Sequence, residues 1–280
     1  MAQKGSAAKR IAKVKRACTA IDKHINELAE QMSQGKSEQL VRYLEVCGRF
    51  HQYSFRNIML AFSQRDNITR LAGLRQWNKL GRHVKSGEKS LIILAPMTFQ
   101  KKAGNEDLED SSITLFRPVY VFDVSQTEGD ELPSLPNSTG DVTTILPALE
   151  KAVREANITL EYKQRDLRRA DGSSFGGRIV VSTDLEAPET FRTLVHEYAH
   201  EKLHWDGPKD EMTIRETEAD ATAFAVCRHF GVTCDSSDYL LLYDATPKVL
   251  LQRLETIRAT AAEIIEDILA HLPETDSSLP

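Results

Sequence analysis

Apolar residues recur at intervals of three and four over much of the chain, which is the spacing of one face of an α-helix. The pattern predicts helices over residues 6–32, 37–47, 55–64, 143–157, 188–205, 213–230 and 247–272. The last of these carries a leucine and isoleucine stripe. We expect this stripe to pack on its own domain rather than on a second chain, because helices of globular proteins usually bury such a face internally.

Continuous apolar runs predict strands. Two of them, Ser90–Ala95 and Phe116–Phe122, flank a polar insert over residues 101–112, which indicates paired strands joined by an exposed loop. Shorter runs over residues 158–162 and 177–182 predict two strands in the second half, and the later one could hold an extended peptide along its edge. The predicted fold class is therefore α+β.

A stretch rich in Pro, Gly, Ser and Asp, residues 126–141, has no hydrophobic period and predicts a linker. We accordingly expect two domains: a helical domain with a small sheet over residues 1–126, a linker over residues 127–142, and a mainly helical domain over residues 143–280. The charge changes sign at the same place. Residues 1–126 hold 21 Lys and Arg against 12 Asp and Glu, a balance of +9, so the remainder balances at −14. A basic front half indicates an anionic partner, most commonly nucleic acid.

Other features narrow the class and the compartment. No apolar run approaches the roughly 20 residues that a membrane span needs, so no membrane association is expected. The first sixteen residues are cationic but lack the apolar segment of a secretory signal, and we interpret them as the start of the first helix. The cysteines form no C-x-x-C pair and indicate reduced thiols in a cytoplasmic protein. They are Cys18, Cys47, Cys227 and Cys234.

Residues 193–200, Thr-Leu-Val-His-Glu-Tyr-Ala-His, contain an H-E-x-x-H motif within a predicted helix. His196 and His200 are four residues apart, so both imidazoles can reach one ion from the same helix face. Glu197, beside the first histidine, would point at the water on that ion. The spacing predicts a Zn²⁺ site, with another divalent metal as the alternative, at which Glu197 is the catalytic base of a hydrolysis. His204 is expected to pack or hydrogen-bond nearby rather than bind the metal.

The next predicted helix offers a third ligand in the sequence Arg-Glu-Thr-Glu-Ala-Asp over residues 215–220. We favour Glu216 as that ligand over its rival Glu218, because the two lie about 200° apart around a helix and cannot both face the ion. Asp220, one turn beyond Glu216, would accept a hydrogen bond from the second nitrogen of a ligand histidine. Alternating small residues would let this helix approach its neighbour closely: Ala219, Ala221, Ala223 and Ala225. A second carboxylate-bearing helix weakens the alternative of a surface helix without metal function.

Both halves of the sequence resemble known families. The segment His196–His200 followed by Glu216–Asp220 resembles the small gluzincin metallopeptidases of the ImmA/IrrE type. The front half resembles the N-terminal domain of ArdC-type antirestriction proteins in residues 53–57, Gln64, Trp77, residues 81–89, Pro96 and residues 121–127. Together these resemblances extend from about residue 8 to the end. The acidic loop over residues 105–110 departs from the family pattern as a local insertion.

The resemblance implies an N-terminal domain that binds single-stranded DNA and a C-terminal minimal-gluzincin metallopeptidase domain. It also implies a plasmid or mobile-element protein that protects incoming DNA from host restriction. The expected partners are single-stranded DNA and a protein or peptide substrate.

Sequence-tolerant binding of single strands needs a cationic track and aromatic faces on which bases stack. The cations expected to form the track are Arg56, Arg75, Lys79, Arg82, Lys85 and Lys89. The candidate aromatics are Tyr53, Phe55 and Trp77, of which the last two are more often core than platform, and Asn57 belongs to the same candidate DNA-binding set. Arg82 and Lys85 lie in a turn between glycines and are the strongest candidates for phosphate contact.

Two other functions stay open. One is a DNA-binding protein without catalysis, in which the metal only stabilises the fold. The other is a regulatory protease that cuts a repressor, with the front domain contacting a protein. The basic glycine-rich turn favours DNA binding over the regulatory protease. Glu197 favours catalysis over the purely structural metal site, because a structural zinc site needs no base beside its ligand.

Overall fold

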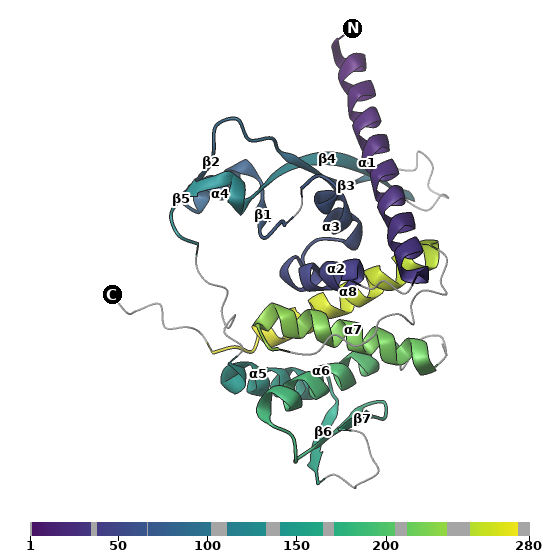
Figure 1. Cartoon of the computed structure of the whole chain (residues 1–280), viewed down its shortest axis with the longest axis vertical. Helices are drawn as coiled ribbons and strands as arrows, with labels where there is room; N and C mark the ends of the chain where they lie inside the picture. Colours follow the sequence, from purple (N-terminus) through teal and green to yellow (C-terminus); the bar gives the residue numbers. More distant parts are fainter. Residues whose placement is uncertain are drawn as a thin grey trace. The chain divides into compact units, whose positions relative to one another are not determined.

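The computed structural model describes residues 2–34, 38–65, 67–101, 111–132, 141–164, 171–204, 212–233 and 247–273 (Figure 1). Contacts between residues divide the chain into two units. Unit 1 comprises residues 1–26 and 56–132, and unit 2 comprises residues 27–55 and 133–280. The long helix α1 (Ala2–Ser33) contributes residues to both units.

Unit 1 combines helices with two small antiparallel sheets. Its elements after α1 are α3 (Phe55–Phe62), β1 (Leu71–Ala72), α4 (Leu74–Lys79), β2 (Arg82–Val84), β3 (Leu91–Lys101), β4 (Ser111–Asp123), the 3-10 helix η1 (Val124–Gln126) and β5 (Thr127–Gly129). One sheet has the strand order β1-β4-β3, and the other pairs β2 with β5. The first three residues of the predicted linker therefore belong to a sheet of unit 1.

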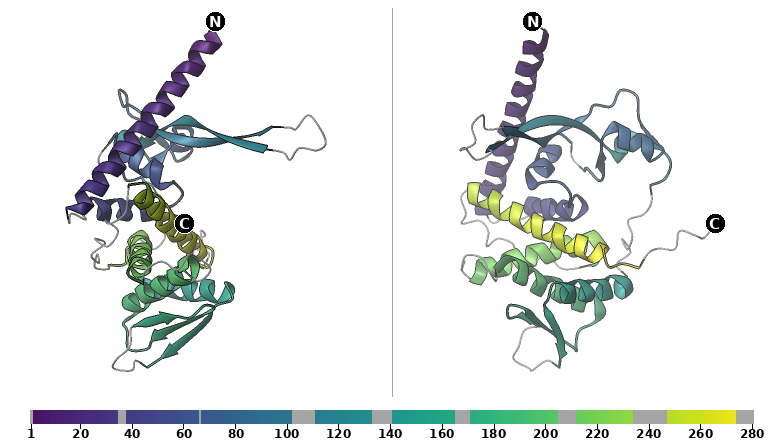
Figure 2. Two further views of the ribbon diagram at one scale, coloured as in Figure 1. Left: turned by 90° about the vertical axis from the view of Figure 1, so that its right-hand side faces the viewer. Right: turned by 180° about the vertical axis from the view of Figure 1, so that it is seen from behind.

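Strands β3 and β4 form the predicted hairpin, and their pairing is longer than the sequence indicated. The register runs from Leu91 opposite Val121 to Lys101 opposite Ser111, and we call this paired segment the β3–β4 arm. Figure 2 shows the arm as a long ribbon that extends past α1. At its base Leu91 and Val121 are buried, whereas Phe116 farther along is exposed. Only part of the arm thus belongs to a core.

Amide side chains close the outer edge of β3. The amide of Asn57 donates to the carbonyl of Leu94 and accepts from its N–H, both at 2.8 Å. Gln64, just beyond α3, makes the same pair of bonds with Ile92, both at 2.8 Å. The next outward-facing position along this edge is Pro96, which has no N–H to offer. The edge is thereby protected from pairing with another strand.

Unit 2 is mainly helical and carries one small sheet. Its elements are α2 (Glu38–Arg49), α5 (Val142–Glu155), β6 (Thr159–Lys163), β7 (Gly172–Ser174), β8 (Arg178–Ser182), α6 (Ala187–His204), α7 (Met212–Phe230) and α8 (Pro247–Leu269). Helices α5 and α6 pack on the sheet, and α7 and α8 pack on the other side of α6 (Figure 1). The C-terminal part of the α8 stripe lies in the core of this unit as predicted, since Ile264, Ile265 and Ile268 are fully buried there.

The sheet of unit 2 corrects one expectation. Its order is β6-β8-β7, with β8 parallel to β6 and antiparallel to β7. The predicted strand over residues 177–182 is β8, the central strand, so both of its edges are already paired and it cannot hold a peptide by edge pairing. Strand β7 lies at the edge instead. Its three residues are too few to show a period of two, so periodicity missed it.

The division into units departs from the predicted domains at residues 27–55. Helix α2 packs against α7 and α8, so this segment belongs to unit 2 although it precedes the sheets of unit 1 in sequence. Gly48 permits the contact, because a Cβ at this position would come within 2.3 Å of the carbonyl oxygen of Ala225. The apolar period of α2 predicted a helix, but it carried no information about the partner of that helix.

The described part of the chain also bears on the cysteines and on membrane association. Cys18, Cys47 and Cys227 are free thiols, and Cys234 lies outside the described residues, as does the acidic insertion over residues 105–110. Among the described residues, no helix combines the length and the apolar character that a membrane span requires.

Replacing Asn57 by alanine is expected to loosen β3, because the N–H and C=O of Leu94 both lose their partner at a partly buried position. Such unsatisfied groups cost roughly 1–3 kcal/mol of unfolding free energy. Hydrogen exchange measured by mass spectrometry should be faster in peptides that cover β3. The matched control is Arg56→Ala at the exposed neighbouring position, with an expected change within about 0.5 kcal/mol. Equal exchange in the two variants would show that the Asn57 amide does not hold this edge.

Candidate metal centre and basic surface

Helix α6 supplies two histidines to one point of unit 2. Phe191, Leu194 and Tyr198 are fully buried in the core, and their packing sets the rotation of α6 about its axis. His196 and His200 consequently share the face that turns toward α7. Their Nε2 atoms lie 3.1 Å apart.

Helix α7 brings Glu216 to the same point. Its Oε2 atom lies 3.4 Å from Nε2 of His196 and 3.4 Å from Nε2 of His200. A tetrahedral ion with bonds of about 2.0–2.1 Å needs ligand atoms about 3.3–3.4 Å apart. The three donor atoms therefore already have the separations that a small divalent cation requires, and these residues form a group that could hold such an ion.

Asp220 orients the first histidine. Nδ1 of His196 lies 2.9 Å from a carboxylate oxygen of Asp220, and Arg192 lies 3.7 Å from that oxygen. This hydrogen bond places the proton on Nδ1 and leaves the lone pair of Nε2 directed at the point shared with His200 and Glu216.

The pKa values of His196 and Glu216 are shifted in opposite directions because the two side chains share a hydrogen bond. Burial lowers the pKa of His196, but hydrogen bonds with the carboxylates of Asp220 and Glu216 outweigh burial and raise the pKa to about 9. The hydrogen bond from His196 in turn lowers the pKa of Glu216 to about 2. A cation held between the donor atoms would supply the positive charge that this proton supplies, so metal binding is expected to release protons.

Glu197 follows His196 on α6, and its carboxyl group interacts electrostatically with His196 and Glu216 and faces β7. It is 7% exposed, and a Cβ at Gly172 would come within 2.8 Å of its Oε1 atom, so β7 passes directly against this carboxyl group. Burial raises the pKa of Glu197 to about 7, against the opposing effects of the charge on His196 and a hydrogen bond from Ser174. The sequence-based reading did not identify Gly172 and Ser174, because they lie in the short strand that has no period.

Glu218, the rival ligand, contacts other residues. Its carboxylate is almost completely buried, 2.6 Å from Nη1 of Arg253 on α8 and 3.7 Å from Nε2 of His204. His204 also lies 3.1 Å from the carbonyl oxygen of Arg215. The structure therefore brings Glu216, and not Glu218, to the two histidines, and His204 hydrogen-bonds nearby as expected. No local pattern in the sequence pointed to Arg253.

Several residues expected to contact DNA are scaffold residues instead. Trp77 is 1% exposed and its Nε1 donates to the carbonyl of Phe122 at 3.0 Å, and Phe55 is fully buried. Neither ring offers a face to a base, in agreement with the alternative that they are core residues. The amide of Asn57 is committed to β3. Tyr53 belongs to unit 2 and is partly buried, and its ring makes a T-shaped contact with that of Phe50.

Arg82 likewise serves the fold of unit 1. Its guanidinium donates to the hydroxyl and carbonyl oxygens of Thr127 at 2.8 and 3.1 Å, and to the carbonyl oxygens of Gly129 and Asp130. These bonds join β2 to β5. With its donors committed in this way, Arg82 does not have the free guanidinium that the expected phosphate contact requires.

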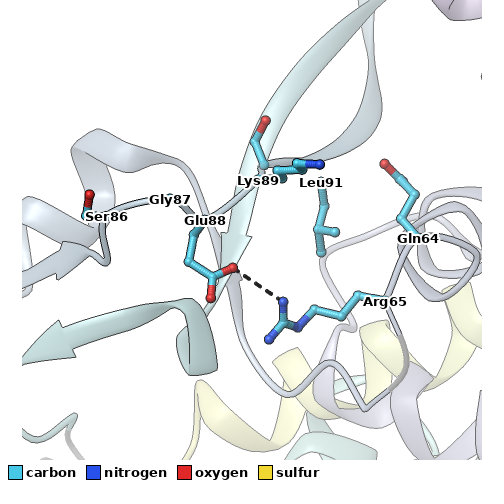
Figure 3. A pocket seen from close by; sticks show the side chains of 8 residues that line it. Gln64, Arg65, Ser86, Gly87, Glu88, Lys89 and Leu91 are labelled. Carbon is cyan, nitrogen blue, oxygen red and sulfur yellow. Dashed lines mark ion pairs between the residues drawn. The ribbon is translucent and has the colours of Figure 1, made fainter.

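The remaining cations of the expected track are exposed: Arg56, Arg75, Lys79, Lys85 and Lys89. Lys89 lines an open hollow of 510 Å³ beside the turn that follows β2 (Figure 3). Figure 3 shows the ion pair between Arg65 and Glu88, 3.5 Å long, in this hollow. Nζ of Lys85 donates to the carbonyl of Ser125 at 3.1 Å and stays at the surface. Unit 1 thus keeps a basic surface around the turn, although Arg82 is not part of it.

Comparison with known proteins identifies the class to which this architecture belongs. Residues 13–122 match the family model of the N-terminal domain of anti-restriction factor ArdC. Two crystal structures of the antirestriction ArdC protein from plasmid R388, one metal-free and one Mn(II)-bound, have the same fold, each with a TM-score of 0.53. The identities are 15% and 14%, and each comparison covers 91% of this chain and 99% of that protein. Residues 13–122 therefore form an ArdC-type N-terminal domain and the whole chain has the fold of ArdC, which confirms the ArdC part of the resemblance found in its sequence. The resemblance of the second half to ImmA/IrrE-type gluzincins stays a prediction.

A more similar sequence belongs to a longer protein. An uncharacterized protein of Bacillus anthracis is 24% identical over 253 residues, a match that covers 74% of this chain and 43% of the relative. The chain thus spans less than half the length of that relative. The chemistry of the candidate metal centre has to be argued from the site itself.

One divalent cation per chain is expected to bind at this centre, and Glu216→Gln should weaken binding by at least about 100-fold, because loss of a mere supporting residue already costs 10- to 100-fold. Isothermal titration calorimetry with a divalent cation measures this directly. Glu218→Gln is the matched control on the same helix. It should retain the metal but lower the unfolding free energy by about 2–3 kcal/mol, since it breaks a buried pair with Arg253. Metal loss in Glu218→Gln, with retention in Glu216→Gln, would show that Glu218 is the ligand and that Glu216 is not.

Proposed function

We propose that this chain is an antirestriction protein that binds single-stranded DNA through unit 1 and hydrolyses a peptide bond at a divalent-metal centre in unit 2. The observation that carries the hydrolytic half is the triangle of donor atoms from His196, His200 and Glu216, with the buried Glu197 beside it. A metal that only stabilised the fold would need no carboxylic acid at that position. The DNA-binding half rests on the ArdC-type N-terminal domain and its positive charge.

Zinc is the cation that we propose for this centre. Two imidazoles and one carboxylate are a usual set of ligands for catalytic zinc, which leaves its fourth position to water. The similar protein from plasmid R388 is known with Mn(II), so manganese is the competing candidate. Donor type alone does not separate the two metals, because imidazole and carboxylate ligands suit both.

The residues around the centre have distinct tasks in the proposed hydrolysis. The bound cation would supply a Lewis acid that polarises water and the substrate carbonyl. Glu197 would accept the proton of the attacking water and later donate it to the leaving amine, and burial raises its pKa toward the range that suits both transfers. His196 keeps Nε2 toward the cation because Asp220 holds the Nδ1 proton. Arg253 keeps the charge of Glu218 away from the centre.

Strand β7 is the proposed support for the substrate. It is the edge strand of its sheet and passes against Glu197, so its backbone can pair with an extended peptide close to the proton-transfer group. Gly172 has no side chain, which leaves room for Glu197 to move between the water and the leaving amine.

Glu197→Gln is expected to bind the cation normally and to lose peptide hydrolysis, because the amide keeps the shape of the side chain but cannot accept the proton. Cleavage of a peptide library read by mass spectrometry, with metal content measured on the same samples, tests this. Glu201→Gln, one helical turn later, is the control, since that residue instead accepts hydrogen bonds from Gly176 and Gly177 and should leave cleavage within a few-fold.

The same variant separates the candidate functions in cells. If Glu197→Gln still protects transferred DNA from restriction, the result supports an antirestriction function that does not depend on catalysis. Normal peptide cleavage by Glu197→Gln would contradict the proposed role of Glu197 in proton transfer.

Single-strand binding should depend on salt and on the exposed lysines of the basic turn. Replacing Lys85 and Lys89 by alanine is expected to weaken binding of labelled oligothymidine. The slope of log affinity against log salt should become less steep by about 1.4, roughly 0.7 for each lost phosphate contact. Fluorescence anisotropy of the full chain measures both. The control is the double variant Lys151→Ala/Lys248→Ala, which removes the same amount of positive charge from exposed positions in the acidic half and should leave the slope unchanged. Equal slopes for the two double variants would contradict a phosphate track at this turn.

A further inference from the structure

The β3–β4 arm exposes aromatic side chains on one of its faces. Phe116 is 53% exposed and Tyr120 is 46% exposed, although large aromatic rings are usually much more buried. Both belong to β4 and are four residues apart, so strand alternation places them on the same face, about 13 Å apart at about 3.3 Å per residue. Leu115, 52% exposed, occupies the opposite face of the same strand.

Positive charge lies next to these rings. Nζ of Lys13 on α1 donates to the hydroxyl of Tyr120 at 2.6 Å and lies 5.0 Å from the centre of the ring. Lys13 is itself exposed. Arg117 is exposed as well, but strand alternation places it on the opposite face of β4, with Leu115. At the base of the arm, Leu91 lines the hollow that also holds Lys89 (Figure 3). One of the two rings thus has a cation beside it, and the basic turn lies at the base of the same arm.

We propose that Phe116 and Tyr120 form the platform on which unpaired bases of single-stranded DNA stack. This inference rests on the proposed function of unit 1 and places its aromatic contacts on residues that composition and motif did not single out. Base stacking on aromatic rings tolerates any sequence, because every base has a π-face, and the neighbouring cations neutralise phosphates. The aromatic residues first expected in this role, Phe55 and Trp77, are buried and cannot take it.

Two features favour a nucleic-acid strand over another occupant. A second copy of the chain would bring the same cation, Lys13, to the contact, where like charges repel. A duplex keeps its bases stacked on one another, so exposed rings gain little from it, whereas a single strand offers free base faces. The net charge of +9 over residues 1–126 complements the phosphates of both single-stranded and duplex DNA. Stacking of bases on the exposed rings favours the single strand.

The test uses the full chain and labelled oligothymidine. Phe116→Ala and Tyr120→Ala should each weaken binding by about 5- to 100-fold, the range for loss of one stacked base. Phe116→Trp and Tyr120→Phe keep a ring and should bind within about 3-fold of the parent chain. Leu115→Ala is the matched control, because it removes a similar exposed apolar side chain from the opposite face and should leave affinity unchanged.

Fluorescence gives a readout that a structural role would not move. The tryptophan of Phe116→Trp should be quenched by saturating oligothymidine, and that of Leu115→Trp should not. Equal losses in Phe116→Ala and Leu115→Ala, or a shift from dimer to monomer in sedimentation of Phe116→Ala, would overturn the proposal. If the parent chain binds oligothymidine and the double variant Phe116→Ala/Tyr120→Ala binds it equally well, this inference fails while the proposed function stands. If the parent chain binds no single strand at any salt concentration, the proposed function fails with it.

Discussion

Helix α7 is enclosed by α6, α2 and α8, and its packing decides which carboxylate meets the two histidines. Three polar contacts hold it in three directions: Asp220 contacts His196 on α6, Glu218 contacts Arg253 on α8, and Nδ1 of His229 contacts the carbonyl of Gly48 at the end of α2. Ala219, Ala221, Ala223 and Ala225 are at most 1% exposed, and their short side chains permit the close approach. A rotation of α7 would break these contacts together, so Glu216 is held at the metal position by the whole helix and not by its own bonds.

Unit 1 uses polar side chains in a different way. Asn57 and Gln64 close the edge of β3, and Arg82 joins β2 to β5. Asp123 accepts hydrogen bonds from the backbone N–H groups of Thr69, Arg70 and Ser125, which lowers the pKa of its buried carboxyl despite the opposing effect of burial. Many residues that resemble the ArdC N-terminal pattern therefore build the scaffold. Exposed cations, including the lysines of the turn, and the exposed rings of the β3–β4 arm remain at the surface of this unit.

The separation of charge along the sequence fits two different sites. Carboxyl groups around the candidate metal centre favour the binding of a cation, while a strand of phosphates needs surrounding charge of the opposite sign. Keeping the basic surface in residues 1–126 and the carboxyl groups in the remainder reduces the affinity of DNA for the centre itself. Net charge thus supports a division of tasks between the two halves of the chain.

The sequence by itself determined the helices, the β3–β4 hairpin and the histidine spacing of the candidate centre, because these depend on the period of apolar residues and on neighbours within one helix. It also indicated Glu216 and Asp220, since the angle between residues on a helix follows from its geometry. Only the tertiary structure decided the partner of α2, the central place of β8, the edge strand β7 and the pairing of Glu218 with Arg253. It also decided that Trp77 and Arg82 are committed to the fold while Phe116 and Tyr120 are exposed. Such choices depend on contacts between distant segments, and a residue of given polarity or size fits a core, a scaffold or a binding surface equally well until those segments meet.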